Sequence, residues 1–240
     1  MSDNQRVLVI GGTRGTGLLI AGLLHRRGVP VRVLARNRTR ALTLFDRRVD
    51  IVTGDVTKAD TLPAAIDGAH HIIFTAGCRS GYPVREALVK ATEYQGVVNT
   101  LEAARRCGFG GRFLYMTSSG LTLPSFSTVC LNLWKGNTLI WRRRVEGEIR
   151  GSGLAYTIIR TGILLNRTGG QHAIEVTQHP LPLSPRYRIA RADVAEVFVA
   201  ALKHPRTARA TFEIVWGSGA RPEPWGGLLD RLEPDAGDCR

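Results

Sequence analysis

The regular alternation of short apolar runs with longer helical patterns restricts the fold of this 240-residue chain more than any other feature. Runs rich in Val, Ile and Leu predict strands at residues 6–10, 29–34, 49–53, 71–75, 112–116, 155–159 and 211–215. Apolar residues three or four apart predict helices at residues 18–27, 40–47, 61–66, 84–107, 139–150 and 192–203. Strands joined through helices need right-handed crossovers, which build a parallel sheet with both faces covered. We therefore expect an α/β fold with a doubly wound parallel sheet.

The length is ample for one such domain and short for two, so we expect a single domain over residues 1–240. Residues 166–186 break the alternation and are rich in Gly, His and Pro. They predict a long loop over the carboxyl edge of the sheet, in a position to cover the substrate. Residues 217–240 are expected to form a C-terminal tail.

The sequence carries no signal for a membrane span or for export. No run of apolar residues approaches the roughly eighteen that a transmembrane helix needs. The first residues, Met1 to Arg6, are polar and lead directly into the first expected strand. The four cysteines form no Cys-x-x-Cys pair, which predicts reduced thiols rather than disulfides or metal ligands. We expect a cytoplasmic protein without a metal site.

The strongest local motif is the segment Gly11-Gly12-Thr13-Arg14-Gly15-Thr16-Gly17, which connects the first expected strand to the first expected helix. Glycines there let the backbone turn sharply and approach a pyrophosphate closely, and the negative charge then lies at the helix N-terminus. The context makes the motif specific, because an apolar strand precedes it and an apolar-faced helix follows it. We predict a dinucleotide-binding turn of the Rossmann type.

The end of the second expected strand indicates which dinucleotide binds. Proteins that take NAD usually place an acidic residue there, which accepts a hydrogen bond from the adenosine ribose. This chain has Arg36 instead, with Arg38 and Arg40 close behind it and Arg14 in the glycine turn. A guanidinium can hold a 2′-phosphate with two donors. We therefore predict NADP(H) as the cofactor, with NAD as the alternative if these arginines are only solvated.

The formal net charge of +13 favours anionic ligands in general. Most of the excess comes from scattered arginines, which fit a solvated basic surface as well as reinforced phosphate binding near Arg36. Nucleic-acid binding usually adds exposed aromatic residues or a recognisable module, and neither is visible. We expect a small-molecule substrate and neither a membrane nor a nucleic acid as partner, and the sequence leaves the oligomeric state open.

With these motifs the chain resembles the atypical short-chain dehydrogenase/reductase family, in particular its NmrA-like, NAD(P)H-binding branch. The likeness runs from Val7 to about Trp216. Gly11 and Gly17 match the outer glycines of the family's Gly-x-x-Gly-x-x-Gly turn, and Arg14 replaces the middle one. The resemblance implies further cofactor contacts after the third, fourth and fifth strands, at Asp55, Val56, Ala76, Gly77 and Thr117. It also implies that the late helix begins near Asp193.

The catalytic pair of the family is missing from this chain. Members with the full mechanism carry Tyr-x-x-x-Lys on the fifth helix, where the tyrosine donates the proton and the lysine lowers its pKa. Those two places hold Thr138 and Arg142 here. Threonine is a very poor acid, and arginine stays charged, so we expect Arg142 to hold the cofactor's ribose without moving a proton.

Three other residues are candidates for the chemistry. Ser118 lies where the resemblance implies the substrate carbonyl, with capping of the strand end as the alternative. Lys135 lies about one helical turn before Thr138, and Tyr82 lies just past the fourth strand. Either side chain can supply a proton if it points into the cleft, and each is otherwise a solvated surface residue.

Two functions fit these observations. The first is an NADP(H)-dependent reductase of a small organic carbonyl, enone or quinone-like substrate, with the proton taken from Lys135, Tyr82 or water. The second is a non-catalytic NADP(H)-binding protein that senses redox state or assists assembly, which the missing catalytic pair favours.

Titration of the purified protein with NADPH, NADP, NADH and NAD tests the cofactor prediction. We expect roughly micromolar or tighter binding of NADPH and its loss in Arg36→Asp, because a carboxylate would then face the 2′-phosphate. Nicotinamide fluorescence follows the binding. Similar affinities for NADPH and NADP favour the reductase, and a large difference favours the sensor. If none of the four bound, both functions would be contradicted.

Overall fold

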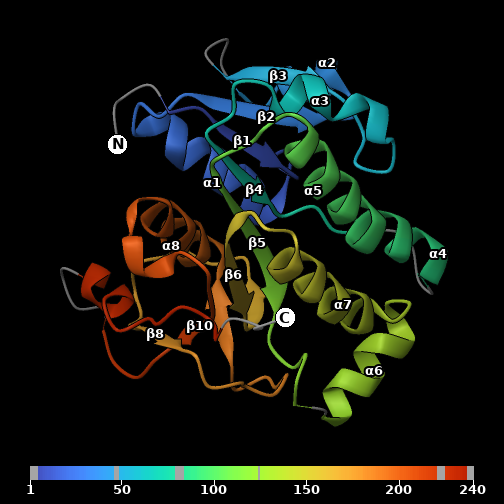
Figure 1. Cartoon of the computed structure of the whole chain (residues 1–240). Helices are drawn as coiled ribbons and strands as arrows, with labels where there is room; N and C mark the ends of the chain where they lie inside the picture. Colours follow the sequence, from blue (N-terminus) through green and yellow to red (C-terminus); the bar gives the residue numbers. More distant parts are fainter. Residues whose placement is uncertain (1–4, 46–48, 79–83, 124, 221–224, 237–240) are drawn as a thin grey trace.

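The computed structural model describes residues 5–45, 49–78, 84–123, 125–220 and 225–236, which form one α/β unit around a central sheet (Figure 1). Its strands are hydrogen-bonded in the order β3-β2-β1-β4-β5-β6-β10-β8. Their bounds are β1 Val7–Ile10, β2 Val31–Ala35, β3 Asp50–Thr53, β4 His71–Phe74, β5 Arg112–Ser118, β6 Ala155–Thr161, β8 Ile174–Thr177 and β10 Ala210–Trp216. The order runs outward from β1 in both directions, which is the doubly wound arrangement. The predicted Rossmann-type fold is confirmed.

The sheet differs from the prediction at one edge. β8 pairs antiparallel with β10, whereas the other pairings of the large sheet are parallel. β8 lies within residues 166–186, so the expected uninterrupted loop is wrong. Ile174 and Val176 face the core while Glu175 and Thr177 face outward, and four alternating residues are too short a signal to stand out among Gly, His and Pro. A short parallel pair, β7 (Ile163–Leu165) and β9 (Arg188–Ala190), brackets the same segment.

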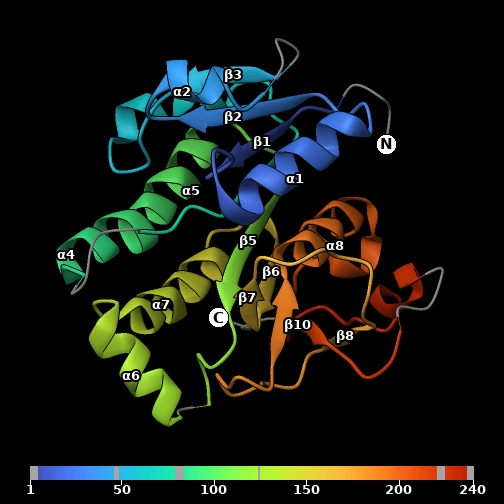
Figure 2. The same ribbon diagram turned by 180° about the vertical axis from the view of Figure 1, so that it is seen from behind.

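Helices cover both faces of the large sheet (Figure 1 and Figure 2). α1 (Gly15–Arg26) and α8 (Arg191–Lys203) pack on one face, and α3 (Pro63–Ile66), α5 (Gly96–Arg106) and α7 (Thr138–Gly151) pack on the other. The remaining helices are α2 (Arg38–Leu42), α4 (Glu86–Val89) and α6 (Phe126–Trp134), of which α6 was not predicted. In the part of the chain that is described, no helix has both the length and the apolar character to cross a membrane.

The strands divide their side chains between the two helical layers. In β1, Val7 and Val9 belong to the core under α1 and α8. Leu8 and Ile10 belong to the core under α3, α5 and α7. All four are at most 1% exposed, as expected of a parallel strand with both faces covered. Burial on both faces therefore orients β1, and with it the turn that follows Ile10.

The long helix expected over residues 84–107 consists of α4, a π-helical turn (Lys90–Gln95) and α5. α5 ends at Arg106, and Gly108 adopts the left-handed conformation with φ +64°, which is typical of a glycine that stops a helix. The π-helical turn rotates the following residues relative to a regular α-helix. Glu93 within this turn is only 5% exposed, so the irregular turn places a carboxylate inside the protein.

The turn between β1 and α1 packs against the end of β4 without intervening side chains. Gly11 has φ +89°, and a Cβ on it would lie 2.6 Å from the backbone nitrogen of Ala76. A Cβ on Gly17 would collide with the Gly11 carbonyl oxygen and with the Thr75 hydroxyl. Glycine is therefore required at both positions, and the start of α1 lies directly beside the carboxyl ends of β1 and β4.

The C-terminal segment, expected as a tail over residues 217–240, packs on the sheet in its described part. Leu229 and Leu232 are buried in the core. The Gln178 side chain after β8 donates to the Glu233 carbonyl at 2.8 Å and accepts from the Glu233 N–H at 2.9 Å. Apolar burial and this pair of hydrogen bonds hold the segment in place.

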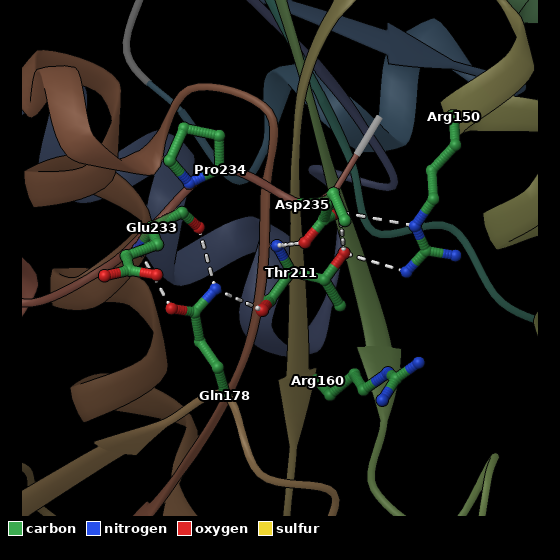
Figure 3. A pocket seen from close by; sticks show the side chains of 8 residues that line it. Arg150, Arg160, Gln178, Thr211, Glu233, Pro234 and Asp235 are labelled. Carbon is green, nitrogen blue, oxygen red and sulfur yellow. Dashed lines mark hydrogen bonds and ion pairs between the residues drawn. The ribbon is translucent and has the colours of Figure 1, made fainter. Parts of the chain in front are cut away.

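A pocket of about 460 Å³ lies where this segment crosses beside β6 and β10 (Figure 3). It is lined by Arg150, Arg160, Gln178, Thr211 and residues 233–236. The Asp235 carboxylate accepts hydrogen bonds from the Thr211 N–H at 2.9 Å, the Thr211 hydroxyl at 2.6 Å and Arg150 Nε at 3.3 Å. These hydrogen bonds hold the C-terminal segment against the start of β10.

Two glycine-to-alanine changes test the close packing of the first turn. We expect Gly17→Ala to lower the free energy of unfolding by about 1–3 kcal/mol, because its Cβ meets backbone that cannot easily move. Gly147→Ala in α7 is the matched control, since its Cβ would enter open space. Higher helix propensity should make it neutral or stabilising by up to about 1 kcal/mol. Urea unfolding measures both, and equal effects would contradict the packing argument.

Candidate dinucleotide-binding site

The residues predicted to bind the cofactor gather at the carboxyl edge of the large sheet. Strands β1 to β5 are parallel, so the segments that follow them open at the same edge. The glycine turn follows β1, and the other positions are Arg36 after β2, Asp55 after β3, Ala76 and Gly77 after β4, and Ser118 at the end of β5. The strand order reverses between β1 and β4, where a doubly wound sheet forms its ligand crevice.

The glycine turn presents backbone N–H groups to this crevice. α1 begins at Gly15, and its N-cap residue Arg14 makes no side-chain capping hydrogen bond. The first turn of α1 contains no acidic residue. A Cβ on Gly15 would have only the Arg191 guanidinium within 4 Å among the described residues, at 3.9 Å. Open space above uncapped N–H groups at a positive helix end fits the diphosphate of a dinucleotide.

Arg14, which stands in place of the family's middle glycine, connects two turns that border the crevice. Its Nη2 donates to the Gly77 carbonyl at 2.7 Å and so links the turn after β1 to the turn after β4. Gly12 packs over the methyl groups of Val33, Thr13 is partly buried, and Thr16 is buried. All seven residues of the predicted turn therefore lie in one rigid connection.

Arg36 is exposed and directly follows the last residue of β2. Its neighbours serve the local backbone: the Asn37 side chain caps α2 by accepting from the Arg40 N–H at 2.9 Å. The Arg38 guanidinium donates to the carbonyl of Ile51 on β3. Of the arginines grouped near this strand end, Arg36 is thus the one immediately at the crevice edge.

Asp55 and Val56 shape the crevice next to β3. The Asp55 carboxylate accepts from the Thr57 N–H at 3.0 Å and the Thr57 hydroxyl at 2.9 Å, which fixes the turn. Val56 is buried, and its carbonyl accepts from the Asn99 side chain at 2.9 Å. These contacts hold the segment that the family resemblance assigns to the adenine.

A buried ionic cluster occupies the place of the missing catalytic pair. Glu93 Oε2 accepts from the Thr138 hydroxyl at 2.6 Å and pairs with Arg142 Nε at 2.7 Å. Glu93 Oε1 accepts from the Cys78 N–H at 2.9 Å. A Cβ on Gly77 would lie 3.3 Å from Glu93 Oε1 and 3.5 Å from Arg142 Nη2, so the cluster directly borders the crevice.

The protonation of Glu93 follows from these contacts. Burial by itself raises the pKa of this carboxyl group. The charge and hydrogen bond of Arg142, together with the donors Thr138 and Cys78 N–H, outweigh burial and hold the pKa of Glu93 below its ordinary value. The cluster is therefore an ion pair at neutral pH, in which Arg142 neutralises a carboxylate.

Glu93 was not identified from the sequence, although one signal was available. It lies four residues after Val89 and four before Val97, both fully buried, so an acidic residue occupies the apolar face of a helical pattern. Such a carboxylate needs a buried partner. The partner comes from α7, well downstream in the chain, and no local pattern connects the two.

Ser118 and Thr117 lie at the end of β5 beside β6. Ser118 is partly buried, and its hydroxyl donates to the Ser119 carbonyl at 3.1 Å, which is the capping contact considered as the alternative to substrate binding. Thr117 is 1% exposed, and its carbonyl accepts from the Thr161 hydroxyl. Thr117 thus supports the floor of the crevice, and Ser118 lies at its edge.

Lys135 ends α6, while Tyr82 falls outside the described residues. Although Lys135 is exposed as a whole residue, partial desolvation lowers the pKa of its ammonium group. The charge of Arg142 lowers this pKa further, Glu93 acts in the opposite direction, and Arg191 adds to the lowering. The charges of Arg142, Glu93 and Arg191 thus all act on the Lys135 ammonium group, and its role in catalysis stays a prediction.

α6 exposes an apolar surface that leads up to Lys135. Phe126, Val129, Leu133 and Trp134 are 84%, 54%, 77% and 65% exposed. Trp134 directly precedes Lys135, so one end of this surface reaches the cleft. In α7, which follows, Leu139 and Trp141 are buried instead.

These features define a Rossmann-type dinucleotide-binding protein with a basic crevice. Among the described residues, no group of three or more His, Cys, Asp or Glu side chains is arranged to hold a metal ion. A family model described as NAD(P)H-binding matches residues 11–205. The chain belongs to this NAD(P)H-binding oxidoreductase family, within the atypical, NmrA-like short-chain dehydrogenases/reductases that its motifs resemble.

Curated relatives of the chain include enzymes and an assembly factor. Sanguinarine reductase of Eschscholzia californica is 29% identical over 262 residues, covering 93% of this chain and 93% of the relative. Photosystem II assembly factor Ycf39 of Synechocystis sp. is 25% identical, covering 89% of this chain and 64% of that protein. Among solved structures, a putative NAD-dependent epimerase/dehydratase from Bacillus halodurans superposes with a TM-score of 0.81 at 24% identity, covering 95% of this chain and all of that one.

Removal of the Glu93 charge tests the ionic cluster. We expect Glu93→Gln to lower the free energy of unfolding by about 3 kcal/mol at neutral pH, because Arg142 is left partly buried without its carboxylate. The pKa of Glu93 is lowered in the folded protein, so its contribution is fully present above the ordinary glutamate pKa of about 4.3. It is lost as the pH falls through the lowered value.

The difference between wild type and Glu93→Gln should therefore shrink as denaturant unfolding is repeated from pH 7 down to pH 3. Glu148→Gln is the control, because Glu148 is exposed and accepts a hydrogen bond from the Tyr94 hydroxyl. It should change stability by less than about 1 kcal/mol. A Glu93→Gln effect that stays constant with pH would assign Glu93 a packing role instead.

Proposed function

We propose that the protein is an NADP(H)-dependent reductase of a small organic carbonyl, enone or quinone-like substrate. The observation that carries the proposal is the pairing of an open glycine turn with the exposed Arg36 at the end of β2. A guanidinium at that position suits a 2′-phosphate and not a bare ribose hydroxyl. NADP(H) is accordingly preferred over NAD(H).

The chain's residues would hold the cofactor along the carboxyl edge of the sheet. The glycine turn takes the diphosphate, Arg36 takes the 2′-phosphate, and Asp55 and Val56 border the adenine. Arg142, engaged with Glu93, stiffens the wall beside Gly77 and offers its remaining N–H donors to the ribose. When bound, the reduced cofactor supplies a hydride to the substrate carbon.

Lys135 and Ser118 complete the proposed reaction. In the proposed complex the Ser118 hydroxyl turns from the Ser119 carbonyl to the substrate oxygen and orients it by a hydrogen bond. As the hydride adds to carbon, the Lys135 ammonium gives one proton to the substrate and is reprotonated by water. A lowered lysine pKa brings the ammonium closer to the acidity that general acid catalysis needs. The apolar surface of α6 next to Lys135 suits a hydrophobic substrate skeleton.

We further infer that this reaction takes place in the cytoplasm. Cys107 and Cys130 are free thiols, as is usual in a reducing compartment. The location is independent of the cofactor assignment.

A second candidate is a non-catalytic NADP(H)-binding regulator or assembly protein. Two observations favour it. Thr138 and Arg142 stand in place of the tyrosine and lysine and are both bound to Glu93. α6 exposes four large apolar side chains, which a protein partner can cover. Different affinities for NADPH and NADP, coupled to partner binding, distinguish this function from the reductase.

Oxidation of NADPH in the presence of aldehydes, enones and quinones tests the reductase. We expect turnover with a substrate of this panel and a loss in kcat of roughly a hundredfold in Lys135→Met, since the general acid is removed. The Kd for NADPH should stay within about twofold. The wild-type rate should fall as pH rises through the lowered lysine pKa, and the variant should lose this dependence.

Lys203→Met at the far end of α8 is the matched control, because it removes an exposed lysine away from the crevice. It should leave kcat and the pH profile unchanged. Tight NADPH binding without turnover over the whole panel would overturn the reductase and leave the regulatory function. If the enzyme turned over substrate and Lys135→Met had the same kcat and pH dependence as wild type, Lys135 would be excluded as the general acid.

A further inference from the structure

Arg191, the first residue of α8, directs its guanidinium toward the glycine turn from the neighbouring helix. Its Nη1 lies 3.4 Å from the Thr16 hydroxyl, and its Nε donates to the Asn166 side chain at 2.9 Å. Among the described residues, Nη1 is also what a Cβ on Gly15 would meet, at 3.9 Å. α1 and α8 lie next to each other on one face of the sheet (Figure 2), so the two helix starts share this edge.

The surroundings of Arg191 leave its charge without an opposite charge. In the described part of the chain, no carboxylate oxygen lies within 4.0 Å of its guanidinium nitrogens. Arg142 and Arg160, by contrast, each pair with a buried glutamate. Burial lowers the pKa of Arg191, but an arginine remains protonated at neutral pH. A partly desolvated cation with neutral partners attracts an anion strongly.

The position of Arg191 in its helix adds to this imbalance. The N-terminal end of a helix carries a partial positive charge, which disfavours a cation in the first turn. α8 nevertheless begins with Arg191, and the acidic residue of its first turn, Asp193, is buried and accepts from the Gly170 N–H and Trp216 Nε1. The neighbouring α1 begins with uncapped N–H groups and no acidic residue in its first turn. The Arg191 guanidinium and the start of α1 therefore both place positive potential above Gly15, and an anion there relieves both.

We propose that Arg191 binds the diphosphate of the dinucleotide. The proposal rests on the function above, because it takes the glycine turn to be the diphosphate site. It separates two roles that arginines have in this crevice. Arg36 recognises the 2′-phosphate, which only NADP(H) carries, whereas Arg191 neutralises the group that NADP(H) and NAD(H) share. Arg191 sets affinity for all dinucleotides, and Arg36 sets the choice among them.

Binding by ligand fragments separates these roles. ADP-ribose carries the diphosphate without a 2′-phosphate, and adenosine 2′-monophosphate carries the 2′-phosphate without a diphosphate. Calorimetric Kd values for NADPH, NADH and both fragments are measured on wild type, Arg191→Gln, Arg191→Lys and Arg36→Gln. Arg206→Gln is the charge-matched control, since Arg206 is exposed beyond the other end of α8.

We expect Arg191→Gln to weaken the binding of NADPH, NADH and ADP-ribose by the same factor, about ten- to a hundredfold. A loss of this size is typical of one lost charged hydrogen bond. Its affinity for adenosine 2′-monophosphate should stay within twofold of wild type. Arg191→Lys should recover part of the loss. Arg36→Gln should show the complementary pattern: weaker binding of NADPH and adenosine 2′-monophosphate, and unchanged binding of ADP-ribose.

Three results would overturn the proposal. Unchanged affinities of Arg191→Gln for NADPH, NADH and ADP-ribose would leave Arg191 a structural contact between α1 and α8. The proposed function would then still stand on the affinities of Arg36→Gln. Equal weakening of both fragments in Arg191→Gln, with the thermal midpoint lowered, would assign its effect to the fold. Failure of wild type to bind NADPH, NADH and either fragment would remove the proposed function itself, before any variant is compared.

Discussion

The close contact between the glycine turn and the end of β4 governs what can lie at the carboxyl edge of this sheet. Gly17 packs on the Gly11 carbonyl and the Thr75 hydroxyl with no room for a side chain. Because nothing separates α1 from the strands, its first N–H groups open directly into the crevice. Arg14 reaches Gly77 from one side of the turn, and Arg191 reaches Thr16 from the other. Both contacts depend on the position that the glycines permit.

The arginines around this turn fall into two kinds: one that is paired with a buried glutamate, and two that have no carboxylate partner among the described residues. Arg142 is neutralised by Glu93, and this ion pair joins α7 to the π-helical turn. Arg36 and Arg191 have no such carboxylate partner within the described chain. A buried ion pair is retained where both charges are well hydrogen-bonded, and the unpaired cations remain available to phosphate groups. The positive charges of Arg36 and Arg191, which no carboxylate of the described chain neutralises, therefore lie at the crevice.

Elements with a strong local pattern could be predicted, and those defined by distant neighbours could not. The strands of the parallel sheet have continuous apolar runs, so β1 was evident from Val7 to Ile10. β8 has only four alternating residues within a Gly- and Pro-rich segment, and it is its pairing with β10 that makes this segment a strand. α6 was missed although Phe126, Val129 and Leu133 recur three or four residues apart, as on one face of a helix; this apolar face is not buried in the fold. Helix starts also shifted: α1 begins at Gly15, where the turn requires it, and not at Leu18.

The sequence by itself determined the fold class, the family and the position of the glycine turn, because each is written in residues that are neighbours along the chain. It also placed Arg36 at the end of β2 and Thr138 and Arg142 in the positions of the missing catalytic pair. Only the tertiary structure decided that Glu93 closes on Arg142 and that Arg191 faces Thr16, 175 positions earlier in the chain. Ionic contacts of this kind depend on side chains that folding brings together from separate helices, and no local period or spacing records them.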